Sequence, residues 1–227
     1  MTISVLQLNI NADNFWDKLI PFLNTHNFDI IQLQEVCGKD SVSGNINCKR
    51  DVFVELQQML ASKYKGELAI ADRYTSSQSS YIGQATFYKN SFTFIDKQII
   101  PLYQRATPFP SDAKSFEDEG RVLLHIRLAF AEKQVSFLNL HGAWAKTSKE
   151  EPHQTVQGEK VLMYLKNVSA PFVFTGDFNL DPEQPTIQKI NTLAKNLISE
   201  NNISNTLNPL RHRAQELFPQ GIAVDYV

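Results

Sequence analysis

Eight short apolar runs, rich in β-branched and aromatic residues, constrain the fold of this chain more than any other feature. Such runs predict strands, and here they cover residues 3–9, 28–36, 85–89, 92–100, 121–130, 134–141, 171–179 and 222–227. Apolar residues at helical spacing predict helices over 13–26, 51–64, 153–167 and 183–198, the last starting near Pro185. Strands and helices alternate at both ends of the chain, whereas the middle contains consecutive strands. This order favours two packed sheets with helices outside them over a doubly wound parallel sheet.

The length and composition are those of one ordinary α/β domain. The chain has 227 residues, 42% of them hydrophobic and 20% charged, and it contains no repeat or linker that would divide it. We therefore expect residues 1–227 to form a single domain, with a surface loop over 108–120. A formal net charge of −2 gives no support to non-specific attraction to nucleic acid and leaves room only for a local basic patch.

The sequence also bears on cellular location. The first residues, MTISVLQLNI, read as a strand and lack the basic and apolar regions of a secretory leader. No apolar run approaches the roughly 20 residues that cross a bilayer. We therefore expect a cytoplasmic monomer that does not bind a membrane. Cys37 and Cys48 lie in one loop segment and are expected to be reduced thiols, with a disulfide as the alternative in an exported protein.

Several predicted strands end in a polar residue with chemical capacity. VLQLN ends at Asn9, IIQLQE at Glu35, SFLNLH at His141 and FVFTGD at Asp177, with Asn179 two residues further on. One such residue alone is usually a turn residue or a helix cap. Because α/β folds build sites from the carboxyl ends of their strands, so many together predict a shared cleft.

Glu35 is the most informative of these residues, because it follows a run, DIIQLQ, that is expected to be almost wholly buried, and brings a carboxylate to the edge of the core. A hard divalent cation such as Mg²⁺ would compensate that charge, since it binds a few carboxylate oxygens together with water and substrate phosphate. A salt bridge to a lysine or arginine is the alternative. In GDFN, Asp177 could orient or deprotonate water, and Asn179 could donate to a developing oxyanion.

The stretches LQLNIN, IIQLQEV, GRVLL, LNLHG, FTGDFNLDP and VDYV, in this order, resemble the endonuclease/exonuclease/phosphatase superfamily. Its members include DNase I-like nucleases, abasic-site endonucleases, neutral sphingomyelinases and inositol-phosphate phosphatases. LQEV and GDFN at this separation are the specific motifs, and the match runs from residue 3 to the last residue. The resemblance implies a four-layered α/β sandwich and metal-assisted hydrolysis of a phosphoester by in-line attack of water.

The resemblance also implies roles for individual residues. Glu35 would hold Mg²⁺ or Mn²⁺, and Asn9 and Asn11 would lie close to the metal or the phosphate, although Asn11 stands where some relatives carry an aspartate. Arg121 matches an arginine that contacts phosphate in the DNase branch. The remaining matched residues act near the reacting atoms: His141 beside the leaving group, Asp177 on the attacking water and Asn179 on the transition state.

Asp225 raises a separate question. In the family, the aspartate of DYV orients a histidine from a later SDH motif, whose own aspartate helps to bind metal. The sequence contains no SDH. We therefore expect an incomplete copy of the catalytic domain, with the final strand or strands missing and with poor hydrolysis of phosphodiesters by residues 1–227 alone. A naturally degenerate form is the alternative.

Other interpretations stay open at this stage. Trp144 could stack on a base or sugar in the substrate cleft, or simply cap the core. PLRHRAQ (209–215) could contact a nucleic-acid backbone, or be solvated surface. The main functional prediction is a metal-dependent phosphodiesterase or nuclease, and the alternative is a non-catalytic binding module with the same fold. The sequence does not choose between DNA, RNA, a phospholipid headgroup and a small phosphoester as substrate.

Overall fold

The computed structural model describes residues 2–43, 46–110, 118–145, 149–169, 171–207 and 222–227, which form two main sheets. One sheet has the strand order β1-β2-β6-β5 and the other β11-β10-β9-β8-β7. The strands of the first are β1 (Val5–Asn9), β2 (Ile30–Cys37), β5 (Tyr64–Arg73) and β6 (Tyr81–Lys89). The strands of the second are β7 (Thr93–Tyr103), β8 (Arg121–Phe130), β9 (Lys133–His141), β10 (Phe172–Asp177) and β11 (Asp225–Tyr226). β3 (Val42–Ser43) and β4 (Ile46–Asn47) form a separate short antiparallel pair.

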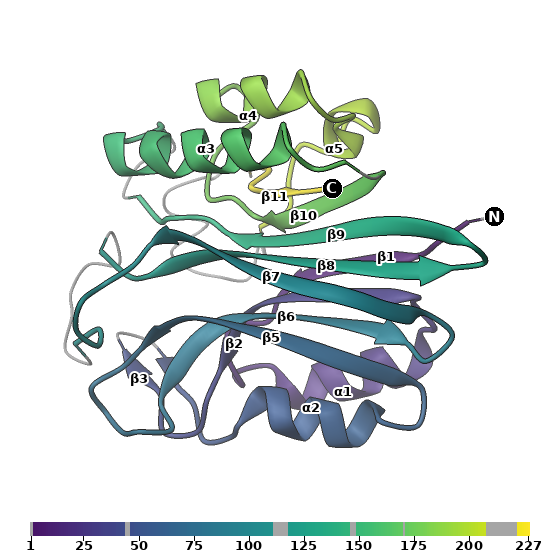
Figure 1. The fold of residues 1–227 in the computed structure, drawn as a ribbon. Coiled ribbons are helices and arrows are strands. Elements are labelled where there is room, and N and C mark those ends of the chain that lie inside the picture. The colour runs from purple at the N-terminus through teal and green to yellow at the C-terminus, as the bar shows by residue number, and fades with distance from the viewer. Residues whose placement is uncertain (1, 44–45, 111–117, 146–148, 170, 208–221) are drawn as a thin grey trace.

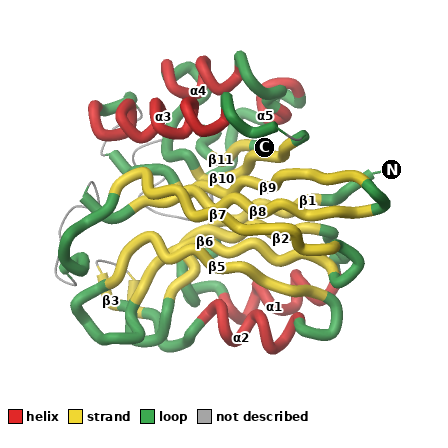
Figure 2. The backbone as a smooth tube through the Cα atoms, viewed as in Figure 1, coloured by secondary structure: helices red, strands yellow, loops and turns green. Residues whose placement is uncertain are grey.

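The helices cover the outer faces of the two sheets. Figure 1 shows α1 (Trp16–Thr25) and α2 (Val52–Leu60) on the β1-β2-β6-β5 sheet. It also shows α3 (Pro152–Leu165), α4 (Pro185–Asn191) and α5 (Leu197–Glu200) on the opposite side of the molecule. Figure 2 makes the helix–sheet–sheet–helix order plain. Separate apolar clusters fill the three layers between these elements. The predicted four-layered α/β sandwich is therefore confirmed.

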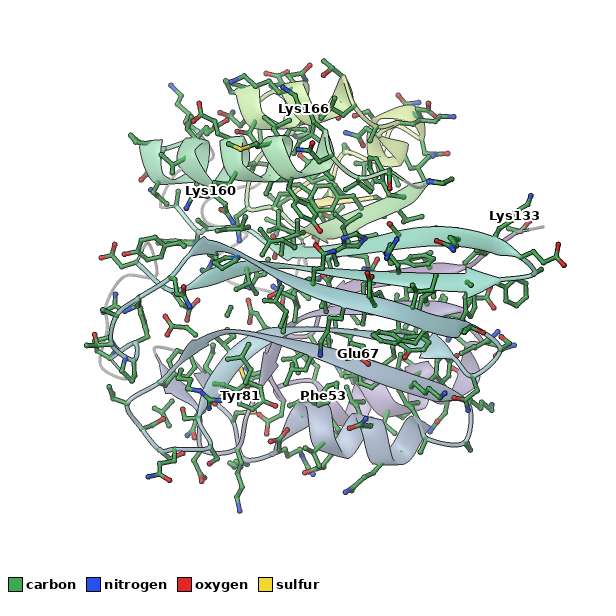
Figure 3. All side chains as sticks on the ribbon, viewed as in Figure 1. Phe53, Glu67, Tyr81, Lys133, Lys160 and Lys166 are labelled. Carbon is green, nitrogen blue, oxygen red and sulfur yellow. The ribbon has the colours of Figure 1, made fainter. Side chains whose placement is uncertain are left out.

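Individual contacts tie the layers together. Lys160 reaches from α3 and donates a hydrogen bond to the carbonyl oxygen of Leu102 in β7 at 2.6 Å (Figure 3).

Cys37 and Cys48 are both buried free thiols, and their mutual hydrogen bond raises the pKa of Cys37. None of the helices in the described part of the chain has the length and hydrophobicity that a bilayer crossing needs.

The structure departs from the predicted elements at several places. β5 was not predicted, because its polar and charged residues interrupt the apolar pattern, and Tyr64 begins this strand instead of ending a helix. β6 starts at Tyr81, ahead of the predicted 85–89; its first part contains Gly83, a residue type that is depleted in strands and that here packs too closely on Ala69 of β5 for any larger residue. The helix predicted over 183–198 is two short helices, and the strand over 222–227 is reduced to β11. Of the loop predicted over 108–120, residues 111–117 lie outside the described part, as does the 209–215 segment.

Each sheet contains one parallel pair of strands, and these pairs position the strand ends. β1 pairs in parallel with β2, and β9 pairs in parallel with β10. A parallel pair needs a crossover connection, which α1 supplies in the first case and α3 in the second. The carboxyl ends of both strands in a pair therefore meet at the same edge. Asn9 is thus beside the end of β2, and His141 is the register partner of Asp177.

The inner faces of these strands change from apolar to polar toward their carboxyl ends. Val5, Ile30, Phe137 and Val173 pack in the apolar layer between the sheets. Two residues further along each strand come Gln7, Gln32, Asn139 and Thr175, which face the same side because the side-chain period of a strand is two. Thr175 donates to Gln32 Oε1 at 2.8 Å, which bonds one sheet to the other. The polar layer leads directly to the strand ends.

Asn139 is the centre of this polar layer, and we expect its replacement to destabilise the fold. Its Nδ2 donates to the carbonyl oxygens of Leu33 and Ala85, and its Oδ1 accepts from Gln34 Nε2 at 2.6 Å. Asn139→Leu would leave Gln34 Nε2 buried without this partner, so the free energy of unfolding should fall by about 3 kcal/mol. Urea unfolding measures this loss. Asn167→Leu, at an exposed position on the surface, should change it by less than about 0.5 kcal/mol, and equal effects of both changes would contradict the prediction.

Candidate active site

Asn9 joins two carboxylates at the ends of strands from different sheets. Its Nδ2 donates to Glu35 Oε1 at 2.9 Å and to Asp177 Oδ2 at 3.0 Å. Its Oδ1 accepts from the backbone N–H of Asn11 at 3.0 Å, which determines which way the amide is turned. Glu35 is 26 positions and Asp177 is 168 positions from Asn9 in sequence, yet both carboxylates contact the amide nitrogen of Asn9.

Glu35 reaches this position because β2 is interrupted. The register between β2 and β6 shifts between Leu33 and Val36, which is a β-bulge, and Glu35 has a φ of 55°. A residue with a side chain rarely adopts this left-handed conformation, so the surrounding structure must hold it there. Bulges re-aim a side chain at a strand end. The bulge turns the Glu35 carboxylate out of the regular pleat and toward Asn9.

The ends of β1 and β10 share one local design. Asp177 Oδ1 accepts from the backbone N–H of Asn179 at 3.1 Å, as Asn9 Oδ1 does from that of Asn11. Asn11 and Asn179 both have a φ of 53°, a region that asparagine tolerates better than most residues. In each case the last strand residue and the residue two positions later are held together at the edge of the cleft. The Asn179 side chain donates to the carbonyl oxygen of Gly142 at 3.1 Å.

His141 is a neutral imidazole in this environment. Burial, together with the nearby Arg121 guanidinium, lowers the pKa of His141 to about 3. Its Nε2 lies 3.9 Å from Glu35 Oε1, so the contact is not an ion pair near neutral pH. A neutral imidazole can donate one hydrogen bond and accept another. His141 can therefore contact a phosphoester oxygen without adding charge.

Asp225 lies beside Asp177 and is held by a residue that the sequence analysis missed. The two aspartates are register partners in the antiparallel pair of β10 and β11. Gln7 Nε2 donates to Asp225 Oδ1 and to Gln34 Oε1, both at 2.8 Å. Burial raises the pKa of Asp225, and the hydrogen bond from Gln7 opposes part of the rise. Burial, followed by the negative charge of Asp225, raises the pKa of Asp177 well above its usual range.

Arg121 and Trp144 stand further from this cluster. Arg121 is 3% exposed; its Nη1 forms an ion pair with buried Glu119 at 2.5 Å, and its Nε donates to the Gly142 carbonyl at 3.2 Å. Trp144 is half-buried in the loop after His141, and its carbonyl oxygen lies 3.0 Å from His153 Nε2. The structure therefore brings seven of the predicted site residues together, namely Asn9, Asn11, Glu35, His141, Asp177, Asn179 and Asp225, with Arg121 behind them and Trp144 on the adjoining loop.

The donor set of this cluster fits a hard divalent cation. Carboxylate and amide oxygens are the protein ligands that Mg²⁺ prefers. Glu35 and Asp177 approach one amide nitrogen of Asn9, Asp225 adds a third partly buried carboxylate, and neutral His141 contributes no positive charge. Within the described ranges, no three histidine, cysteine, aspartate or glutamate side chains are arranged so that they could hold a metal ion by themselves. Mg²⁺ commonly takes one or two carboxylates and completes its shell with water and substrate phosphate.

The residues that the sequence analysis missed carry side-chain amides, buried or half-buried, next to the predicted ones. Gln7 stands two residues before Asn9, and Asn139 two before His141, so each shares a strand face with a predicted residue. A glutamine or asparagine inside an apolar strand was the feature that could have identified them. Gln154 and Gln157 on α3 are also buried and contact the loop after His141.

Comparisons with solved structures show the same fold elsewhere. The catalytic domain of human Nocturnin with bound sulfate is 19% identical, with a TM-score of 0.68, and the match covers 99% of this chain and 80% of that one. An endonuclease/exonuclease/phosphatase from Bacteroides vulgatus is 17% identical, with a TM-score of 0.70 and coverage of 99% and 85%. D. rerio TDP2 in complex with a single-strand DNA product is 15% identical, with a TM-score of 0.63 and coverage of 99% and 82%. At these identities the likeness shows the fold.

Two further comparisons concern the sequence itself. A search of curated proteins found no match. The model of the endonuclease/exonuclease/phosphatase family, in contrast, matches residues 6–226, a range that runs from β1 to β11 and includes every residue of the cluster. The chain therefore belongs to the endonuclease/exonuclease/phosphatase family.

Proposed function

We propose that the protein is a metal-dependent phosphoester hydrolase, most specifically a phosphodiesterase or nuclease. The observation that carries the proposal is the meeting of Glu35 and Asp177 around Asn9 Nδ2 at 2.9 and 3.0 Å. Buried strand ends that gather carboxylates are expensive unless a cation and an anionic substrate compensate them. Membership in a family named for nucleases and phosphatases supports the same chemistry.

The roles of the residues follow from their positions. Glu35 would hold Mg²⁺ or Mn²⁺, with Asn9 and Asn11 beside it, and the bound ion would supply positive charge against the phosphate oxygens. Asp177 would orient the attacking water and take its proton as the new phosphorus–oxygen bond forms and the ester bond opposite breaks. Asn179 and neutral His141 would donate hydrogen bonds to the phosphoryl oxygens and the leaving oxygen. Asp225, held by Gln7, would help to keep its strand partner Asp177 oriented.

The proposed partner is a phosphoester, and nucleic acid is the first candidate because the D. rerio TDP2 relative was solved with a single-strand DNA product. Arg121 and Trp144 are proposed as substrate-binding residues, Trp144 by stacking. ANGEL2, a protein whose solved structure has a similar fold, is described as a 2′,3′-cyclic phosphatase, so a small phosphoester is the next substrate to try. Cytoplasmic location and the monomeric state stay predictions.

A substrate panel tests the proposed activity. Purified protein, first treated with EDTA, would be assayed on single-strand and nicked DNA, RNA, sphingomyelin, a cyclic nucleotide and a chromogenic phosphodiester. We expect hydrolysis of at least one of them only after Mg²⁺ or Mn²⁺ is added. Activity that persists in EDTA would contradict metal dependence. Binding of a substrate without hydrolysis at any metal concentration would favour the alternative, a non-catalytic binding module.

A further inference from the structure

The dipeptide after His141, Gly142–Ala143, has all of its backbone polar groups bonded to residues from other elements. Gly142 N–H donates to the carbonyl oxygen of Asp177 at 2.7 Å, and Ala143 N–H donates to Gln157 Oε1 at 2.8 Å. The Gly142 carbonyl accepts from Arg121 Nε and from Asn179 Nδ2, and the Ala143 carbonyl accepts from Gln154 Nε2 at 2.9 Å. We call these two residues the 142–143 bridge, because they join the end of β9 to the end of β10.

The bridge packs closely against the backbone that follows β10. A Cβ atom on Gly142 would lie 2.3 Å from the carbonyl oxygen of Phe178, so only glycine allows this approach of the two backbones. The contact lies between the two residues proposed to act on water and phosphate, Asp177 and Asn179. A change in the bridge would therefore alter the positions of Asp177 and Asn179 directly.

Gln154 connects the bridge to Asn179 through a single amide group. Its Nε2 donates to the Ala143 carbonyl at 2.9 Å and to the Asn179 carbonyl at 3.1 Å. Its Oε1 accepts from the backbone N–H of Glu151 at 3.0 Å, which determines which side of the amide faces the loops. The residue is 2% exposed on α3. Both amide hydrogens are thus used to link two loops that come from separate strands.

Asn179 needs such support because of its backbone. With a φ of 53° it is in the left-handed region, which persists only where neighbouring groups hold it. Asp177 Oδ1 holds its N–H at 3.1 Å, and Gln154 holds its C=O. The direction of the Asn179 side chain depends on both bonds, and its Nδ2 then donates to the bridge.

We propose that Gln154 is a positioning residue that fixes Asn179 for the transition state of the hydrolysis. The inference rests on the proposed function. Gln154 does not touch substrate; it acts through the Asn179 carbonyl and the 142–143 bridge. Gln157, one helical turn further along α3, differs in one respect that makes it a matched comparison. Gln157 contacts Ala143 through its acceptor: Oε1 accepts a hydrogen bond from the Ala143 N–H. Gln154 contacts Ala143 through its donor: Nε2 donates to the Ala143 carbonyl.

Substituting glutamate for Gln154 and for Gln157 distinguishes the effect of losing the donor from that of keeping the acceptor. Gln154→Glu removes the donor and places an oxygen against two carbonyl oxygens, whereas Gln157→Glu keeps the acceptor of a glutamine that is also buried. We expect Gln154→Glu to lower kcat about 10–100-fold with KM changed by less than about threefold. Gln157→Glu should lower kcat much less. Gln154→Met, which removes the donor without adding charge, should follow Gln154→Glu and serves if that variant folds poorly.

A readout without turnover keeps this inference separate from the proposed function. The side-chain amide resonances of Asn179, assigned in ¹⁵N-labelled protein through their loss in Asn179→Asp, should shift in both Gln154 variants and much less in Gln157→Glu. Unshifted resonances in the Gln154 variants would overturn the inference, as would shifted resonances with an unchanged kcat. Shifted resonances in a protein whose wild type hydrolyses no phosphoester would refute the proposed function and leave the positioning of Asn179 standing.

Discussion

Asp177→Asn is expected to lower phosphoester hydrolysis by about 10²–10⁴-fold, the usual contribution of a positioned general base. The amide keeps the size of the side chain and one oxygen, which can accept from the Asn179 N–H as Asp177 Oδ1 does at 3.1 Å in the wild type. It loses the capacity to take a proton from water. Initial rates at saturating Mg²⁺ measure the loss, with enough protein to follow a slow wild-type reaction.

The same substitution should leave the fold intact or stabilise it. A carboxyl whose pKa is raised in the folded state destabilises that state above its ordinary pKa of 3.8, because the unfolded chain loses its proton first. In metal-free buffer, the gain in stability of Asp177→Asn over wild type should therefore grow as the pH rises from about 4 to neutral. Asp181→Asn, in the same loop, provides the control and should change neither rate nor stability appreciably. A large loss of stability in Asp177→Asn would show that the rate effect is a folding effect.

Glu35→Gln should weaken the binding of Mn²⁺ by at least about tenfold, since the loss of a residue that only hydrogen-bonds a metal ligand already lowers metal affinity by about that factor. Glutamine keeps an oxygen that Asn9 Nδ2 can bond, as it bonds Glu35 Oε1 at 2.9 Å, so the bulge at this position should survive. Hydrolysis should fall about 10²–10³-fold at a fixed low Mg²⁺ concentration. Part of this loss should be recovered at high Mg²⁺.

Calorimetric titration with Mn²⁺ measures the affinity, and the Mg²⁺ dependence of the rate measures the recovery. Glu67→Gln is the matched control, because Glu67 is a strand glutamate in the same sheet that pairs with Lys97 at 2.8 Å. That variant should bind Mn²⁺ as the wild type does. Equal Mn²⁺ affinity in wild type and Glu35→Gln would remove Glu35 from the metal site.

The layers of the fold could be predicted because most of the buried strands are continuous apolar runs. β8 and β9 follow their apolar patterns almost to the residue. β5 could not be predicted, since polar and charged residues interrupt its apolar pattern, such as Glu67, which is half-buried and pairs with Lys97 of the other sheet. The β-bulge at Glu35 has no sequence pattern either, because it depends on how β2 pairs with β6, a strand some fifty residues away.

The candidate site divides in the same way. A polar residue at the end of an apolar strand can be recognised from the sequence as a candidate site residue, as Asn9 and Asp177 were. The residues that support the site are glutamines and asparagines whose hydrogen-bond partners are distant in sequence. Gln7 bonds Asp225, 218 positions away, and Gln154, on α3, bonds the carbonyl oxygen of Asn179. For Arg121 the resemblance predicts a phosphate contact, which stays a proposal. The partners of its guanidinium in the structure, Glu119 and the Gly142 carbonyl, could not be predicted from the sequence.

The most direct test of the central claim is to locate a metal ion crystallographically. Crystals of the wild type would be soaked in millimolar Mn²⁺, and anomalous differences would be collected at the manganese absorption edge. The account predicts one main peak, within about 2.5 Å of a Glu35 carboxylate oxygen and on the side that faces Asp177. A main peak elsewhere in the protein, or none beside Glu35 at that concentration, would contradict it.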